Sequence, residues 1–481
     1  MPTLETDYLI IGAGATGLSF ADTLLKESDA QITIVDKHAQ PGGHWNDAYP
    51  FVALHQPSAF YGVNSLELGV GRKDSVGHNA GLFELASGAE VTGYFHKVMQ
   101  QVLLPSARVR YLPMSNYLGM ENGSSDARVA QVASILSGHE TQIKVRKKLV
   151  DATFFTPQVP ATSAPKFKVA DGARLVSPTQ LTHIWQSADA RPSNFCILGA
   201  GKTAMDAAVW LLSCGAAPES IQWVMPRDSW LVNRITTQPT EEFFAHSIGG
   251  VAKQMKALAE ATSVEHLFEK LEASGQMLRL DRSHKPSMFH YATMSEGEVQ
   301  LLRQIKNIIR KGRVQAIEND ALMLAEGRVT MPPNTLYINC TASGVDAGHK
   351  QTEMAPIFQP GLIVPKLVRA PLISFSAAVC AYVEAHYADD ATKNQLCPVV
   401  PFPRNIAGYI TSTITNMTNQ VRWSQDKKLR SWMTSSRLDG FSKMTASIEE
   451  DDHEKIAILN ELRAQGMAAM GNVKKLMASA I

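Results

Sequence analysis

Short apolar runs that lead into a glycine-rich turn and then into a helical pattern occur at two places in the chain. The first run covers residues 8–11 (YLII), residues 18–26 (LSFADTLLK) carry apolar positions at helical spacing, and a further run follows at 31–35 (QITIV). A continuous apolar run is typical of a strand buried in a parallel sheet, and a period near 3.6 indicates a helix. The start of the chain therefore predicts a strand–helix–strand unit.

The same pattern returns in the middle of the chain. Residues 195–198 (FCIL) form an apolar run, residues 205–213 (MDAAVWLLS) have helical spacing, and residues 220–225 (SIQWVM) form the next run. Strands that alternate with helices indicate a parallel sheet covered by helices. The sequence therefore predicts an α/β protein with two βαβ units.

The turn of the first unit has the glycine spacing of a dinucleotide-binding loop. It comprises Gly12, Gly14, Ala15, Thr16 and Gly17, and the second strand ends at Asp36, followed by Lys37. The three glycines permit a tight turn, a close approach of the backbone to a pyrophosphate, and close packing of helix on strand. The start of the helix attracts phosphate, and an acid at the strand end accepts hydrogen bonds from ribose hydroxyls. We therefore expect a bound dinucleotide.

The turn of the second unit departs from this pattern in two informative ways. It comprises Gly199, Gly201, Lys202 and Thr203, with Ala204 in place of the third glycine. The next strand ends at Arg227 instead of an acid, and an arginine there can pair with a 2′-phosphate. We therefore predict NADP, although the adjacent Asp228 leaves NAD as the alternative. Lys202 is expected either to neutralise phosphate charge or to point into solvent.

A short segment after Asp36 carries a resemblance to a known family. The segment is Pro41-Gly42-Gly43-His44-Trp45. It resembles the Gly-Gly-x-Trp segment of flavoproteins with two dinucleotide-binding domains, in particular flavin-containing and Baeyer–Villiger-type monooxygenases. The resemblance implies that the first dinucleotide is FAD and that Gly43, His44 and Trp45 lie near its flavin.

The polar residues that follow this segment are the candidates for catalysis. We single out Asp47, His55 and Gln56. His55 and Gln56 stand between apolar residues, where polar side chains are costly to bury without partners. They are expected either to hydrogen-bond the flavin or a peroxide formed on it, or to be ordinary satisfied polar groups.

The order of the motifs predicts an NADP-binding domain inserted into an FAD-binding domain. The FAD-binding domain is expected at residues 1–176 and 336–481, and the NADP-binding domain at 177–335 with a helical insertion at about 239–310. Residues 156–165 have the composition of a linker. The segment Cys340-Thr341-Ala342 resembles the one at which the chain of the flavoprotein monooxygenases returns to the FAD domain.

The last part of the chain is expected to be helical. Residues 375–386 have a helical composition, and the tail after Glu450 predicts a surface or dimer helix, which leaves a homodimer as an option. The predicted fold class is thus α/β, with a Rossmann-like FAD-binding domain, an inserted Rossmann-like NAD(P)-binding domain, a helical insertion and a helical C-terminus.

Composition and charge limit the classes of binding partner that the sequence gives reason to expect. The chain has 481 residues with 46 basic and 45 acidic ones, so its net charge of +1 gives no reason to expect nucleic acid or an anionic membrane. Its five cysteines include no CxxC pair, which favours reduced thiols in a cytoplasmic protein. No apolar stretch is long enough to span a membrane, and the histidines show no metal-ligand spacing.

FAD beside NADP predicts hydride transfer from nicotinamide to flavin, after which the electrons need an outlet. No cysteine lies in the first 195 residues, which excludes the disulfide reductases. We predict an NADPH-dependent FAD monooxygenase that oxygenates a small organic substrate with dioxygen through a flavin hydroperoxide. The alternative is an NAD(P)H reductase or dehydrogenase that passes electrons to a quinone or protein, and a third hypothesis is a non-catalytic protein that uses FAD structurally.

One monooxygenase motif is not present in the chain. Class B monooxygenases carry a fingerprint, FxGxxxHxxx followed by an aromatic residue, just before the second glycine loop. This chain has FFTPQVPATS from residue 154 instead, without the matching glycine or histidine. The resemblance therefore covers the two-domain framework and the Gly-Gly-x-Trp segment only.

Overall fold

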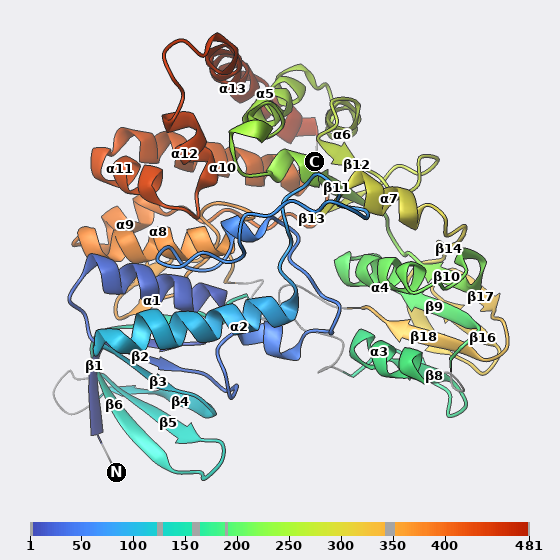
Figure 1. Ribbon diagram of the computed structural model, residues 1–481, viewed down its shortest axis with the longest axis horizontal. Coiled ribbons are helices and arrows are strands. Elements are labelled where there is room, and N and C mark those ends of the chain that lie inside the picture. Colours follow the sequence, from blue (N-terminus) through green and yellow to red (C-terminus); the bar gives the residue numbers. More distant parts are fainter. Residues whose placement is uncertain (1–2, 123–127, 156–163, 188–190, 342–351, 480–481) are drawn as a thin grey trace.

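The computed structural model describes residues 3–122, 128–155, 164–187, 191–341 and 352–479 (Figure 1). A large sheet forms the first unit, with the strand order β19-β20-β6-β1-β2-β3 and an antiparallel extension, β4 and β5, next to β6. Its strands are β1 (Thr3–Ile11), β2 (Ile32–Val35), β3 (Val109–Leu112), β4 (Ser115–Asn122), β5 (Arg128–Ser134), β6 (Glu140–Asp151), β19 (Phe358–Gln359) and β20 (Leu362–Ile363).

Helices α1 (Ala15–Glu27), α2 (Gly88–Val98) and α8 (Ile373–His386) cover one face of this sheet (Figure 1). Near the start of the two helices, the Ser19 hydroxyl donates to the carbonyl of Ser374. At their other ends, Nε2 of His386 lies 2.9 Å from Oε2 of Glu27. Helices α1 and α8 therefore run parallel, and both begin at the carboxyl edge of the strands. The predicted first βαβ unit and the predicted helix at 375–386 are confirmed.

The second unit is a parallel sheet of order β14-β10-β9-β18-β8. Its strands are β8 (Arg174–Val176), β9 (Asn194–Leu198), β10 (Ile221–Val224), β14 (Asn307–Ile309) and β18 (Thr335–Asn339), with α3 (Pro178–Gln186) and α4 (Lys202–Ser213) beside them. A small sheet accompanies it, made of β7 (Lys168–Val169), β15 (Val314–Ile317), β16 (Ala321–Leu324) and β17 (Gly327–Thr330). The second predicted βαβ unit is confirmed as well.

The strand pairing places the start and the end of the second unit elsewhere than the expected boundaries at residues 176 and 336. Strand β8 pairs with β18, and β18 pairs with β9, so all three belong to the second sheet. Short strands such as β7 and β8 are fixed by partners that lie far away in sequence, and they carry little local signal. The second unit therefore begins near residue 166 and includes the strand that ends at Asn339, while most of the expected linker lies outside the described residues.

The expected helical insertion at 239–310 is helical only in its first half. Helices α5 (Phe244–Glu260) and α6 (Val264–Ala273) match the expectation. The chain then forms β12 (Met277–Leu278) and β13 (Met288–Met294), which flank β11 (Ser229–Asn233), before α7 (Glu296–Leu302) and β14. The helical expectation for residues 277–294 was wrong, because pairing with β11 decides the conformation there.

The C-terminal part is helical, as expected. It contains α9 (Asp390–Leu396), α10 (Ile406–Gln425), α11 (Lys427–Ser435), α12 (Gly440–Ala446) and α13 (His453–Ser479). Helix α13 packs on α5 at the top of Figure 1, where the Asn472 amide donates to the carbonyls of Leu258 and Ala261. Among the described residues, no helix is both long and apolar enough to cross a membrane.

The third glycine of the first loop allows α1 to approach β1 closely. A Cβ at Gly17 would lie 1.9 Å from the carbonyl oxygen of Gly12, which neither backbone segment can accommodate. We expect Gly17→Ala to lower the free energy of unfolding by about 3 kcal/mol or more, because the helix must move away from the strand. Chemical denaturation measures this loss.

Gly93 provides the matched control. It lies exposed in α2, and a Cβ there would have no heavy atom within 4 Å. Gly93→Ala should raise the free energy of unfolding by about 0.5–1 kcal/mol, because alanine restricts the unfolded chain. Equal effects of the two substitutions would contradict the packing role of Gly17.

Candidate functional site

Two helices begin at glycine loops without a capping side chain. The N-cap of α1 is Gly14 and that of α4 is Gly201, and neither makes a side-chain cap hydrogen bond. Gly12 and Gly199, two residues earlier, have φ values of +103° and +122°, which favour glycine. The first N–H groups of a helix lack intrahelical acceptors, so an uncapped start at the edge of a parallel sheet fits an anion such as a pyrophosphate.

The space at the second loop is open where a phosphate would approach. A Cβ at Gly201 would have no heavy atom within 4 Å. At the first loop, Gly14 instead packs against Gly43, since a Cβ on Gly43 would lie 2.9 Å from the Cα of Gly14. Gly43 therefore contacts the loop itself, and its nearness to a flavin stays a prediction.

The carboxylate of Asp36 lies beside the first loop and is held in place by several donors. Its Oδ2 accepts from the backbone N–H of Ala13 at 2.5 Å, and its Oδ1 accepts from the N–H of His38 at 2.7 Å. Nδ1 of the His38 ring lies 2.8 Å from the same Oδ1. Oδ2 thus keeps a second lone pair for a ribose hydroxyl, which fits the expected role of Asp36. Lys37, next to it, is exposed.

His38 also links Asp47, one of the predicted catalytic residues, to Asp36. Its Nε2 lies 3.0 Å from Oδ2 of Asp47, so the imidazole bridges Asp36 and Asp47. Asp47 therefore belongs to the network around Asp36. Sequence reasoning missed His38, although its place two residues after a strand-end aspartate is a common setting for local side-chain hydrogen bonds.

Residues 43–47 form a short 3-10 turn that places two aromatic rings together. The rings of His44 and Trp45 stack with centroids 5.3 Å apart, and Nε1 of Trp45 donates to the Tyr61 hydroxyl at 2.7 Å. Burial lowers the pKa of His44 to about 4, so its imidazole is neutral at pH 7. Trp45 packs on the core of the first unit.

The loop that contains Tyr61 is fixed from the far end of the chain. The guanidinium of Arg437 donates to the carbonyls of Ala59, Tyr61 and Val63 at 2.7–2.8 Å. The Tyr94 hydroxyl accepts from the N–H of Val63 at 2.8 Å. The connection between α11 and α12 therefore holds the loop that supports Trp45.

The chain between residues 48 and 86 crosses to the second unit (Figure 1), and its first contact is with α4. The Tyr49 hydroxyl donates to Oδ2 of Asp206 at 2.7 Å, and Oδ1 of Asp206 pairs with the ammonium of Lys202. Phe51 stacks on Trp210 with ring centroids 5.1 Å apart. The predicted nucleotide residue Lys202 therefore faces this contact and is largely buried. A hydroxyl-bearing neighbour, Thr203, lies beside Tyr49.

His55 lies in the same junction between the units. Burial lowers the pKa of its imidazole well below the usual range, and the nearby cations Lys202 and Arg234 lower it further. The ring is therefore neutral at pH 7. Gln56, next to it in the chain, donates from its amide to the carbonyl of Phe60 at 3.4 Å. The catalytic role of Asp47, His55 and Gln56 stays a prediction.

A fully buried arginine anchors the crossing segment. Nε of Arg234 donates to the His55 carbonyl at 3.2 Å, and its terminal nitrogens reach Asn79, Glu298 and the carbonyl of Thr293. Its side chain has no exposed surface. No local sequence pattern predicts this complete burial.

The end of β10 presents an exposed arginine and a sequestered aspartate. Arg227 is exposed. Both carboxylate oxygens of Asp228 accept from the Arg310 guanidinium at 2.8 Å, and Asp228 is buried. Asp228 is therefore engaged with Arg310, and the choice between NADP and NAD stays a prediction.

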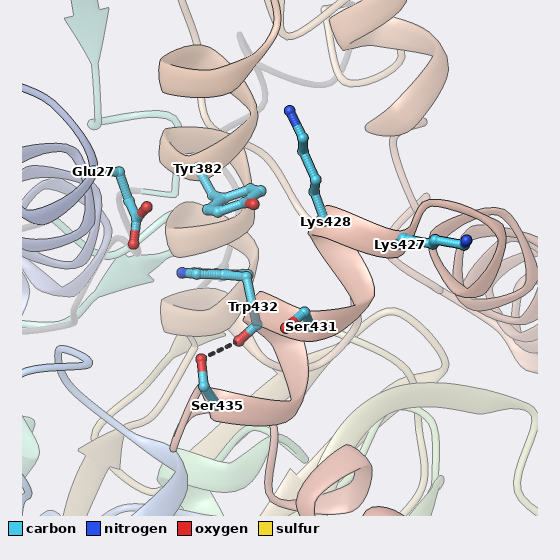
Figure 2. Close-up of a pocket in the computed structure, with 7 residues that line it drawn as sticks. All are labelled: Glu27, Tyr382, Lys427, Lys428, Ser431, Trp432 and Ser435. Atoms are coloured by element: carbon cyan, nitrogen blue, oxygen red, sulfur yellow. Dashed lines mark hydrogen bonds between the residues drawn. The ribbon is translucent and has the colours of Figure 1, made fainter.

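A separate hollow of about 490 Å³ lies on the outer surface. Figure 2 shows Tyr382 and Trp432 side by side between Glu27 and Lys428, and their rings stack at 4.6 Å. Glu27 ends α1, so this hollow lies at the opposite end of the helix from the glycine loop. It does not belong to the dinucleotide site.

Comparisons with known proteins agree with this geometry. Residues 10–64 match the model of the NAD(P)-binding Rossmann-like domain family. The chain is 42% identical over 437 residues to the uncharacterized protein Rv2000 of Mycobacterium tuberculosis, covering 91% of this chain and 78% of that protein. The uncharacterized protein Mb2023 of Mycobacterium bovis matches to the same extent.

A solved structure shows the fold. The chain superimposes on a polycyclic ketone monooxygenase from the fungus Thermothelomyces thermophila with a TM-score of 0.52 and 13% identity. The match covers 98% of this chain and 89% of that one. The expected α/β fold with two Rossmann-like units is thereby confirmed.

The contact between Tyr49, Asp206 and Lys202 is testable through stability. Asp206→Ala leaves a largely buried ammonium without its carboxylate, and we expect the free energy of unfolding to fall by about 2–4 kcal/mol. Tyr49→Phe removes one hydrogen bond and should cost about 1 kcal/mol. Guanidinium chloride titrations measure both.

A double variant separates charge burial from general disruption. Lys202→Met combined with Asp206→Ala removes both charges and should recover part of the loss seen with Asp206→Ala alone. A double variant that is less stable than Asp206→Ala would refute the buried pair.

Proposed function

The chain belongs to the same family as the uncharacterized mycobacterial protein Rv2000, and from that premise and the site geometry we propose that it is an FAD- and NADPH-dependent oxidoreductase. The observation that carries the proposal is the junction itself. Tyr49, shortly after the first βαβ unit, contacts Asp206 on α4, which begins at the second loop. Two dinucleotides bound at these loops would face a common region.

The residues of the first loop fit FAD. Gly12 and Gly14 form the turn, and Ala15, Thr16 and Gly17 begin α1 with backbone N–H groups for the pyrophosphate. The carboxylate of Asp36 would accept a hydrogen bond from a ribose hydroxyl. The neutral His44 ring and the Trp45 ring would flank the isoalloxazine. Bound FAD supplies hydride acceptance and onward electron transfer, which no side chain in the junction provides.

The residues of the second loop fit NADPH. Gly199 and Gly201 form the open turn, and the start of α4 would meet the pyrophosphate. Arg227 is exposed at the end of β10, where the 2′-phosphate of NADP would lie, while Asp228 is held by Arg310. Lys202 serves mainly to fix the junction.

The reaction class we propose is monooxygenation of a small organic substrate. NADPH, a proton, dioxygen and the substrate would give NADP⁺, water and the oxygenated substrate. The chain would contribute His55 at the junction, whose imidazole is neutral and therefore unable to act as an acid at pH 7. The fold of the fungal polycyclic ketone monooxygenase supports this class.

An anaerobic titration tests the proposal first. We expect the purified protein to carry flavin, and NADPH to bleach its visible absorbance in the absence of air. On admission of ¹⁸O₂ with a substrate panel, label should appear in a product. Complete conversion of the electrons to hydrogen peroxide or to a quinone, with no label in any organic product, would favour the reductase alternative. Failure of NADPH and NADH to bleach the flavin would refute the proposal.

The preference for NADPH is tested at Arg227. Arg227→Ala should raise the KM for NADPH about tenfold or more and leave the KM for NADH nearly unchanged, because only NADPH has the 2′-phosphate. The exposed cation of Lys311, just after β14, provides the matched control, since Lys311→Ala removes the same charge nearby. An equal rise for both cofactors in Arg227→Ala would exclude the 2′-phosphate role.

A further inference from the structure

The guanidinium of Arg369 is half-buried, and in the described part of the chain no hydrogen bond or ion pair reaches it. Two other enclosed arginines, Arg234 and Arg437, instead bind several oxygens each. A guanidinium is always charged and offers five donors, so enclosing it without acceptors is costly. Because part of the Arg369 side chain stays accessible, a bound molecule can reach these donors.

Arg369 lies at the same edge of the first sheet as the dinucleotide loop. Strand β20 runs parallel to β6, and β6 runs parallel to β1. The segment 364–372 joins β20 to α8, and it therefore leaves the sheet at the carboxyl edge, as the loop between β1 and α1 does. Ligands of parallel sheets bind at this edge.

The backbone around Arg369 is fixed by side chains from two helices. Its N–H donates to the hydroxyl of Ser376 on α8 at 3.1 Å. The next N–H, that of Ala370, donates to Oδ1 of Asn416 on α10 at 2.9 Å. A fixed backbone lowers the entropy that a side chain loses when it orders on a ligand.

Aromatic side chains from two further elements lie around the guanidinium. Its central carbon is 6.0 Å from the ring centroid of Phe441 on α12, and Phe441 stacks on Phe60 of the crossing segment with centroids 5.6 Å apart. The Tyr291 hydroxyl on β13 is near enough to interact electrostatically with Arg369, and it lies 2.7 Å from the Ser412 hydroxyl. The guanidinium therefore lies where the first unit, the crossing segment, β13 and the C-terminal helices meet.

Tyr291 adopts a backbone conformation that favours glycine. Its φ is +58°, at the point where the register between β11 and β13 shifts. Such a conformation is strained for a bulky residue, and irregular positions of this kind are common where a strand has to aim a side chain at a site. The strain at Tyr291 is a second observation, independent of the unpaired cation, that marks this cluster.

The nearest carboxylate does not neutralise Arg369. Asp439 acts on the guanidinium only at a distance and forms no ion pair with it, while its own carboxylate accepts from the hydroxyl of Ser442. Burial lowers the pKa of Arg369, and the charge of Asp439 offsets this effect only in part. The cluster thus combines an uncompensated cation with aromatic rings. A guanidinium matches a carboxylate through two parallel hydrogen bonds, and the rings suit an apolar body.

We propose that Arg369 binds the carboxylate of the organic substrate, so that the substrates are carboxylic acids with an apolar body. This inference rests on the proposed function, because it takes the substrate of the flavin enzyme to lie beside Tyr291 and Phe441. The phosphates of the two dinucleotides would be bound at the starts of α1 and α4, which leaves Arg369 for another anion. Binding involves no covalent step.

Arg369→Met tests this role, because methionine keeps an unbranched apolar side chain and removes the charge and the donors. The probes are benzoate, phenylacetate and cinnamate, each beside its neutral amide. In the wild type, we expect at least one acid to bind saturably and about tenfold more tightly than its amide. Arg369→Met should weaken binding of that acid about 10- to 100-fold and leave its amide nearly unchanged. Arg369→Lys keeps the charge but not the planar fork, so its loss should be intermediate.

Arg430 provides the matched control. It is exposed on α11, among the same C-terminal helices. Arg430→Met removes the same charge from the surface, and the affinity for every acid should match that of the wild type. Equal weakening of acid binding by Arg369→Met and Arg430→Met would show a general effect of net charge and overturn the inference.

The experiment uses the purified full-length holoprotein of the wild type and the three variants. Binding is followed by the change in the visible flavin spectrum and by the rise in melting temperature as each probe is added. Loss of the preference for acids in Arg369→Met alone, with unchanged flavin content, supports the inference. Equal affinities of acids and amides in the wild type overturn it, as does the absence of saturable binding by any of the acids.

The flavin itself reports the competing role of Arg369. Faster loss of FAD from Arg369→Met, or an altered flavin spectrum before any acid is added, would show that the guanidinium binds the cofactor and would overturn the inference. Failure of NADPH and NADH to bleach the wild-type flavin contradicts the proposed function instead. Acid binding is then still measured by the melting temperature, so the two failures are distinguishable.

Discussion

The burial of one guanidinium constrains how the two units meet. Arg234 has no exposed surface, so its donors must all find acceptors within the protein. Those acceptors come from the crossing segment at His55 and Asn79 and from the second unit at Thr293 and Glu298. Displacing any of these segments would remove partners of a fully buried charge, which is a costly change. The position of the crossing segment is thereby set.

The remaining contacts of that segment follow from this position. Tyr49 reaches Asp206 on α4, and Phe51 packs on Trp210 of the same helix. On the other side, Arg437 holds the loop around Tyr61 through three carbonyls. The connection between α11 and α12 and the second unit therefore both contact this one segment.

The two dinucleotide loops use the same backbone geometry with different surroundings. The first loop packs tightly on Gly43 and is completed by the fixed carboxylate of Asp36. The second loop is open at Gly201 and has an exposed arginine at the strand end. A tightly enclosed loop suits a cofactor that stays bound, and an open loop suits one that must exchange in every turnover.

The local patterns of the sequence were sufficient for both βαβ units, for the helix that begins at Ile373 and for the helical tail, because each depends on apolar periodicity and glycine spacing within about 35 residues. They were insufficient for β8 and β13 and for the sheet to which β18 belongs, since the partners of these strands lie far away in the chain. They also grouped Asp47 with His55, whereas in the structure the His38 ring bridges Asp47 and Asp36. No sequence pattern predicts three of the contacts, namely those of Tyr49 with Asp206, of Arg234 with Glu298 and of Arg437 with backbone carbonyls. Each joins residues far apart in the chain, so it forms only when folding buries both groups side by side. The sequence alone therefore determined where the two glycine loops and the helices that follow them lie, and the tertiary structure decided which side chains meet between them.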